Sequence, residues 1–211
     1  MDKCKCEAKL SEIEFTSPDG SKIYGKTGTI SKDVKIGKGS KIEGKTIVIE
    51  DGVRIGENVS IRAKNVKLGY GCKIGNGVRC DFRAIPDKIE IGDFTEVAEG
   101  VKIRIPSLHI GDYGRIHSEV VFYGEKKCII GHNCWIGQWS ILNSAENLVI
   151  GNNFRLGVQS QIWTHVASGE IIEGCKIYNV ESTHIEDDVW LVGHSIVSPG
   201  IRIKKRTTVL P

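Results

Sequence analysis

The sequence lacks the features that would place it in a membrane, on nucleic acid or in a disulfide-linked scaffold. No apolar run approaches the ~18 residues of a membrane span, and the opening MDKCKCEAKL has no apolar core of the kind found in signal peptides. The net charge is only +3, and the basic residues are scattered rather than gathered in a stripe. The 7 cysteines are an odd number without the close, even spacing of a secreted disulfide framework. These absences predict a soluble, cytoplasmic protein with no membrane span and no nucleic-acid partner.

The sequence also offers little that would bind a metal ion. Cys4 and Cys6 are close together, but a structural zinc site needs four ligands and no second pair is near. The zinc site of a γ-type carbonic anhydrase needs three histidines, two of them closely spaced, whereas no two of the 6 histidines here are closer than 8 residues. No glycine-rich nucleotide-binding domain precedes the repeats described below, which argues against nucleotidyl transfer. We therefore expect no metal.

What the sequence does contain is a six-residue repeat of apolar side chains. Within each triplet the step is six residues, and the triplets begin at 30, 49, 68, 91, 110, 130 and 150, followed by a last series from Ile185 to Val209. A helix cannot use this period, because six residues rotate a side chain to its far side, whereas short strands joined by tight turns can. Three such strands make a triangular coil, and coils stacked at ~4.8 Å pair their backbones. The repeat predicts an all-β, parallel β-helix solenoid of about eight to nine triangular coils.

Two segments depart from the repeat. Residues 1–29 are predicted to form an N-terminal capping segment that closes the first coil of the solenoid, which occupies residues 30–211. The repeat stops after Ile162 and resumes at Ile185, so residues 163–184 are predicted to be an extruded loop. Such insertions are uncommon without a functional reason. Several side chains of this loop are suited to hydrogen bonding with a sugar: Ser168, Glu170, Glu173, Tyr178, Asn179 and Glu181.

The start of this insertion carries His165, within QIWTHVASGE. An imidazole, with an ordinary pKa of about 6.5, suits a general base at neutral pH. A histidine at the surface of a loop is the plainer interpretation of the same residue. His184, just before the repeat resumes, is the competing candidate for the base or for a substrate contact.

The six-residue repeat, with glycine often second, resembles the hexapeptide-repeat acyltransferases, which are left-handed parallel β-helices. Residues 130–211 are most similar to the maltose, galactoside and xenobiotic O-acetyltransferases, through IGNNFRLGVQSQIWTH and IEDDVWLVGHSIVSPGIRIKKRTTV. The resemblance implies the left hand of the solenoid, acetyl-CoA as acyl donor, and a homotrimer with active sites between neighbouring helices. A repeat of this kind specifies the fold better than the function.

The resemblance also implies roles for particular residues. His165 matches the catalytic base. Trp190 and Gly193 match positions that line the pantetheine channel for CoA, and Asn143 and Ser144 match contacts to the acceptor hydroxyl. Trp163, directly before Thr164 and His165, could supply a stacking wall for a sugar ring or anchor the loop.

The chain departs from the related sequences in two places. A second histidine that many relatives carry two residues after the first is Ala167 here. Relatives also continue through a further coil with a lysine-containing tail that touches CoA. Either Lys204, Lys205 or Arg206 takes over the phosphate contact, or the protein is truncated, or CoA binding is lost.

These features predict an acetyl-CoA-dependent O-acetyltransferase that acts on a hydroxyl of a saccharide, either a surface polysaccharide or a sugar precursor. The transfer is expected to be direct, without a covalent acetyl-enzyme. Two alternatives remain open: a non-catalytic structural or scaffold β-helix, and an acetyltransferase acting on an antibiotic or an amino sugar.

Overall fold

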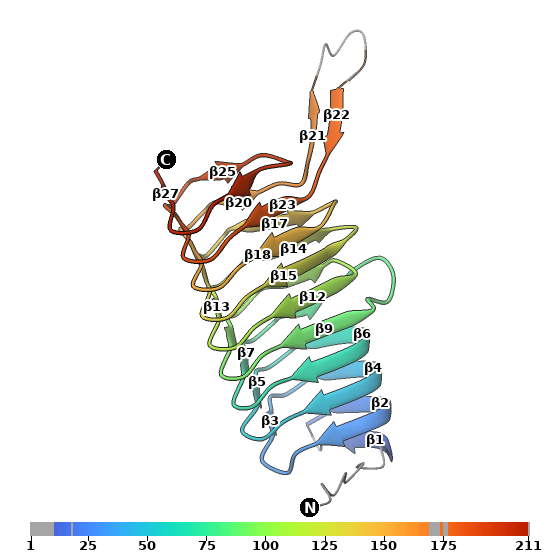
Figure 1. Ribbon diagram of the computed structural model, residues 1–211. Helices are drawn as coiled ribbons and strands as arrows, with labels where there is room; N and C mark the ends of the chain where they lie inside the picture. Colours follow the sequence, from blue (N-terminus) through green and yellow to red (C-terminus); the bar gives the residue numbers. More distant parts are fainter. Residues whose placement is uncertain (1–10, 18, 169–173, 175–176, 211) are drawn as a thin grey trace, which may run out of the picture.

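The computed structural model describes residues 11–17, 19–168, 174 and 177–210. These residues form strands and turns but no helix, so the described part of the chain contains no helix that could cross a membrane. The strands wind into a column of stacked triangular coils, with the N-terminus near one end and the C-terminus near the other (Figure 1). The predicted fold is confirmed: the protein is a left-handed parallel β-helix of about nine turns.

The column has three faces, which we number in the order in which the chain crosses them. The first face consists of β2 (Lys22–Ile30), β4 (Lys41–Ile49), β6 (Ser60–Leu68), β9 (Lys88–Ile91), β12 (Ser107–Ile110), β15 (Lys127–Ile130), β18 (Leu148–Ile150), β23 (Thr183–Ile185) and β26 (Arg202–Ile203). The second face consists of β3 (Lys35–Ile36), β5 (Arg54–Ile55), β7 (Lys73–Ile74), β10 (Glu96–Val97), β13 (Arg115–Ile116), β16 (Trp135–Ile136), β19 (Arg155–Leu156), β24 (Trp190–Leu191) and β27 (Thr208–Val209). The third face consists of β8 (Arg79–Cys80), β11 (Lys102–Arg104), β14 (Val121–Gly124), β17 (Ile141–Ser144), β20 (Gln161–Ile162) and β25 (Ile196–Val197). In the first coils β2, β4 and β6 run around the corner, so that β6 pairs with both β8 and β9.

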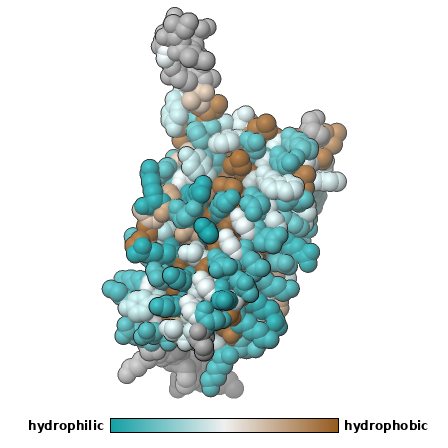
Figure 2. Space-filling model, turned by 180° about the vertical axis from the view of Figure 1, so that it is seen from behind, coloured by the Kyte–Doolittle hydropathy of each residue, from teal (hydrophilic) through white to brown (hydrophobic). Residues whose placement is uncertain are grey.

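The repeated apolar side chains fill the interior, as predicted. All of them are buried except Ile30, Ile36 and Val209, which lie in the end coils and are partly buried. The register is in phase from coil to coil, for example Ile110 beside Ile130 and Ile130 beside Ile150. Polar side chains at the corners also point inward, and their hydroxyls bond the next coil, as Ser40 Oγ does to Gly56 O at 2.7 Å. The interior is therefore one continuous apolar column, while the face seen in Figure 2 is mostly hydrophilic with scattered apolar side chains.

The N-terminal boundary differs from the prediction. β1 (Ser11–Thr16) pairs antiparallel with β2 and covers its edge, which is a capping arrangement. However, β2 pairs in parallel with β4 from Lys22 onward, and Ile23 is only 1% exposed. The solenoid thus begins at Lys22 and not at residue 30. Ile23 escaped the six-residue count because the residues six and twelve positions before it, Ser17 and Ser11, are not apolar.

The interruption of the repeat is a β-hairpin. β21 (His165–Ser168) pairs antiparallel with β22 (Ile177–Val180), and the pair projects away from the column near its C-terminal end (Figure 1). The hairpin leaves the third face after β20 and returns to the first face at β23. The extruded loop predicted for residues 163–184 is therefore present, with Glu170 and Glu173 outside the described residues.

Candidate active site

The base of the hairpin is held by bonds to the coils on both sides of it. Ile162 is the last inward side chain of its coil and is fully buried. The next residue, Trp163, donates its backbone N–H to Val197 O at 2.9 Å and accepts at its carbonyl from Thr183 Oγ1 at 3.1 Å. Because Trp163 is fixed in this way, the position of His165 two residues later is fixed by the solenoid.

His165 lies half-buried where the hairpin meets the column. Its Nδ1 is 2.9 Å from Asn143 Oδ1. The Trp163 ring stands edge-on to the imidazole with centroids 5.4 Å apart, and the Tyr178 ring lies on the other strand with a centroid distance of 6.4 Å. The imidazole is hydrogen-bonded through one nitrogen and has an aromatic ring on either side. Its other nitrogen can accept a proton, and the two rings can pack against a substrate that contains a ring.

Asn143 lies in the interior and does not line an open site. Its side chain is 0% exposed, and the predicted contact to an acceptor hydroxyl stays a prediction. Its Nδ2 donates to Tyr123 O at 3.1 Å, and its Oδ1 accepts from Thr164 Oγ1 at 2.9 Å and from the Thr164 N–H at 3.2 Å. The structure thus places Asn143 beside His165, as a partner of the imidazole.

Ser144 is also buried, at 0% exposure, and its predicted contact to the acceptor stays a prediction as well. Its hydroxyl donates to Lys126 O at 3.1 Å within the coil stack. This bond satisfies the hydroxyl inside the protein, so Ser144 has a structural role at the corner.

Trp163 is a second predicted substrate residue that the structure brings beside His165. Its indole Nε1 donates to Gln161 Oε1 at 2.9 Å, which fixes the ring beside the imidazole. Sequence reasoning did not single out Thr164, although it is fully buried and bonds Asn143. A threonine directly before a histidine at the end of a coil is the signal that could have indicated it.

Trp190 and Gly193 lie elsewhere on the column. Trp190 is in β24 on the second face, 53% exposed, between Arg155 and Thr208 in the register. Gly193 follows in the next turn and approaches Gly157 so closely that a Cβ on Gly157 would be 2.5 Å from the Gly193 Cα. Both therefore lie on a different face from the hairpin that carries His165.

His184 is exposed on the first face, between Val149 and Arg202 in the register. No hydrogen bond or ring contact joins it to His165 in the part of the chain that the structure describes. His117 lies on the corner after β13, and burial, followed by the nearby Arg115 charge, lowers its pKa. The His117 ring packs against Trp135 with centroids 4.4 Å apart, but neither histidine has both a buried hydrogen-bond partner and two aromatic neighbours, as His165 has.

No cluster of three or more His, Cys, Asp and Glu side chains suited to a metal occurs among the described residues. Cys4 and Cys6 lie outside them. The four described cysteines are buried, and burial raises the pKa of each thiol, to about 12 at Cys72 and about 11 at Cys80 and Cys134. These thiols fill core volume, as the position of Cys80 in the repeat predicts.

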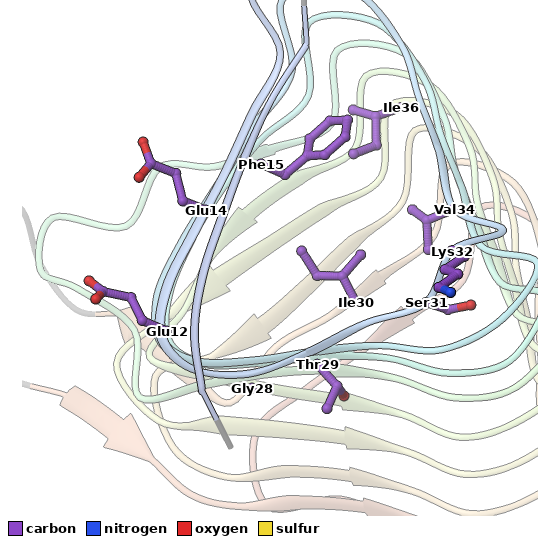
Figure 3. Close-up of a pocket in the computed structure, with 10 residues that line it drawn as sticks. All are labelled: Glu12, Glu14, Phe15, Gly28, Thr29, Ile30, Ser31, Lys32, Val34 and Ile36. Carbon is purple, nitrogen blue, oxygen red and sulfur yellow. The ribbon is translucent and has the colours of Figure 1, made fainter. Parts of the chain in front are cut away.

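A hollow of about 550 Å³ lies at the other end of the column, where the first coil is open (Figure 3). Phe15, Ile30, Val34 and Ile36 provide its apolar lining, while Glu12 and Glu14 point outward. This hollow contains neither His165 nor any other predicted site residue.

Comparison with known proteins adds no further argument. No protein-family model matches the sequence, and a search of curated proteins finds no match. Among solved structures, a UDP-N-acetylglucosamine acyltransferase from Campylobacter jejuni aligns with 83% of this chain and 68% of its own, at 14% identity and a TM-score of 0.28. A likeness this weak supports no inference about activity.

Proposed function

We propose that this chain is a hexapeptide-repeat acyltransferase that moves an acetyl group from acetyl-CoA to a hydroxyl of a saccharide. The observation that supports this most is the placement of His165. It is the one described histidine that is anchored by a buried side chain and flanked by two aromatic rings. The motifs shared with sugar O-acetyltransferases on either side of the hairpin point to the same chemistry.

The reaction needs a base because a neutral alcohol attacks a thioester poorly. His165 accepts the hydroxyl proton as the alcohol oxygen bonds to the acetyl carbonyl carbon. The tetrahedral intermediate then collapses, the carbon–sulfur bond breaks, and the imidazolium returns its proton to the leaving CoA thiolate. No acetyl-enzyme forms, and no metal takes part.

The aromatic side chains beside His165 suit a saccharide acceptor. Trp163 and Tyr178 offer apolar ring surfaces, against which the C–H faces of a sugar can pack, and both carry a polar group. Tyr178 is 66% exposed, so it is open to a large ligand such as a glycan. In this proposal the two rings hold the acceptor while its hydroxyl faces the imidazole.

The donor site requires a second copy of the chain in this proposal. Trp190 lies on the second face and Gly193 in the turn that follows it, whereas His165 projects from the junction of the third and first faces. A homotrimer could bring the second face of one copy against the hairpin of another. The exposed Lys204, Lys205 and Arg206, in the turn after β26, are then the candidates for the CoA phosphates.

The test is acetyl transfer to a panel of saccharides, measured by mass spectrometry of the acetylated product. His165→Ala should lower kcat by about 10² or more, since a general base contributes on this scale. His184→Ala is the matched control and should leave kcat near wild type. If His184→Ala abolishes transfer while His165→Ala does not, the assignment of the base is wrong.

A thermal-shift measurement tests the donor separately. CoA and acetyl-CoA should each raise the Tm of the wild-type protein at millimolar concentration, because a ligand that binds the folded state stabilises it. If neither raises the Tm, the enzyme proposal fails and a non-catalytic scaffold becomes the better interpretation.

A further inference from the structure

Asn143 departs from the pattern of its own row on the third face. The side chains at its position in the earlier coils point outward and are exposed: Glu43, Arg62, Asp81, Arg104 and Tyr123. Asn143 follows Tyr123 in this register, yet it is 0% exposed. Something covers this one position of the row.

The base of the hairpin provides the cover. Thr164 and His165 lie over Asn143, and Thr164 is itself fully buried. An amide buried in this way is costly unless its polar atoms are hydrogen-bonded, and here both the nitrogen and the oxygen have partners. The insertion therefore converts a surface position of the solenoid into an interior polar site directly behind the imidazole.

The orientation of the Asn143 amide is set by backbone groups that cannot change roles. Its Nδ2 faces Tyr123 O at 3.1 Å, and a carbonyl oxygen can only accept. The atom at the Oδ1 position of the amide faces the N–H groups of Ala145 and Thr164, each at 3.2 Å, and these can only donate. Reversing the amide would place N–H against N–H and oxygen against oxygen, so the atom near His165 is the oxygen.

This orientation determines the state of the imidazole. An amide oxygen can only accept, so His165 Nδ1, 2.9 Å away, must carry a proton to bond it. In the neutral ring the remaining nitrogen, Nε2, then holds the lone pair. We propose that Asn143 is a positioning residue that holds His165 as the Nδ1–H tautomer, so that Nε2 is the atom that accepts the acceptor's proton.

The catalytic meaning of this inference rests on the proposed function, but its structural content does not. The tautomer of a histidine can be measured in the free protein, without acyl donor or acceptor. The neighbouring Thr164 provides a matched control, because its hydroxyl bonds Asn143 Oδ1 at 2.9 Å and does not bond the imidazole among the contacts described. Thr164→Val removes that bond and keeps the side-chain shape.

The first experiment is NMR of the full chain labelled with ¹⁵N-histidine, at a pH where His165 is neutral. His165→Gln identifies its signals among those of the 6 histidines. The wild-type imidazole should show a protonated Nδ1 and an unprotonated Nε2. Asn143→Ala should lose this preference, whereas Thr164→Val should keep it.

The second variant, Asn143→Asp, tests the same contact through charge. A carboxylate still accepts from Nδ1, but it loses the bond that the amide donates to Tyr123 O, so the variant is compared only where circular dichroism shows it folded. The added negative charge should raise the pH at which the imidazole loses its proton. The imidazole then stays protonated, and therefore unable to act as a base, up to a higher pH. The pH profile of kcat should move upward by the same amount, so activity lost near pH 7 returns as the pH rises. Asn143→Ala should instead lower kcat by about 10-fold or more, within the range that a general base contributes.

The possible outcomes separate this inference from the proposed function. A protonated Nε2 in the wild type, or a tautomer and pKa unchanged in folded Asn143→Ala and Asn143→Asp, overturns the inference. A kcat that falls equally at every pH in Asn143→Asp indicates a merely structural role and also overturns it. If the tautomer behaves as expected but no saccharide is acetylated, the positioning role stands and the proposed function fails.

Discussion

Replacement of Gly157 by alanine tests how closely the C-terminal coils approach one another. Gly157 follows β19, and its N–H donates to Leu191 O in the next coil at 2.7 Å. A Cβ at this position would be 2.5 Å from the Gly193 Cα and 2.7 Å from the Val192 carbonyl carbon. Both are backbone atoms, so no side chain can rotate away to make room.

The expected loss of stability follows from the shift that the methyl group requires. Ordinary contact begins at 3.4 Å, so the Gly193 Cα must move by about 0.9 Å, the difference between 3.4 and 2.5 Å. Such a shift disturbs the Gly157 bond to Leu191 and the bond from the His194 N–H to Val158 O. Two broken bonds with unsatisfied partners cost about 2–6 kcal/mol. Alanine recovers only about 0.4–1 kcal/mol by restricting the unfolded chain.

The net expectation is a loss of about 3 kcal/mol in the free energy of unfolding. Gly77→Ala is the matched control, because a Cβ there meets nothing within 4 Å and only the positive φ of +66° opposes it. The positive φ costs alanine about 1–2 kcal/mol, and the restriction of the unfolded chain offsets part of this cost, as it does at Gly157. Gly157→Ala should therefore lower stability clearly more than Gly77→Ala.

Urea denaturation followed by far-UV circular dichroism is the suitable assay, because its signal reports on the strands of all coils, those around Gly77 as well as those around Gly157. Solenoids can unfold in parts, so the comparison uses midpoints of the same transition. Equal midpoints for the two variants would refute the reasoning from backbone contact.

Two further predictions concern titrating groups. The four described cysteines should resist maleimide at pH 8 in the folded protein and react after denaturation, as peptide mass spectrometry would show, because burial raises their pKa: Cys72, Cys80, Cys128 and Cys134. Labelling of any of them in the folded protein would contradict their burial. The Lys205 backbone N–H and the Arg202 guanidinium hold the pKa of Glu186 below its ordinary value of 4.5. Its contribution to stability is therefore present above pH 4.5 and lost as the pH falls through the lowered pKa, so Glu186→Gln should show a smaller fall in Tm with acidification than the wild type. An identical fall in both proteins would exclude this contribution.

The interior of the solenoid was predictable because the signal is local and repeated many times. Each inward side chain, such as Ile110, is followed six residues later by another, such as Ile116, and both are buried. At the N-terminal end no apolar residue stands six positions before Ile23, so the count began only at Ile30, although β2 already pairs with β4 from Lys22. The insertion was predictable for the same reason, since the repeat ends at Ile162 and resumes at Ile185, which lies beside Ile150 of the preceding coil.

The candidate site was only partly predictable. His165 and Trp163 were identified because they stand at the break in the repeat, and they do lie together. Asn143 and Ser144 were assigned to the acceptor because sequence position does not reveal burial. Asn143 occupies an outward position, and only the hairpin base some twenty residues later in the chain covers it.

The amino-acid sequence by itself determined the solenoid, its apolar column and the place where it opens, because these depend on side-chain periodicity along the chain. Tertiary structure alone decided which groups meet at that opening. Asn143 is buried beneath Thr164 and His165. The orientation of its amide is fixed by the Tyr123 carbonyl and by the N–H groups of Ala145 and Thr164. The tertiary structure also placed Trp190 on another face of the column. Such meetings depend on how coils stack and where a hairpin folds back, and no local pattern of residues encodes these distances.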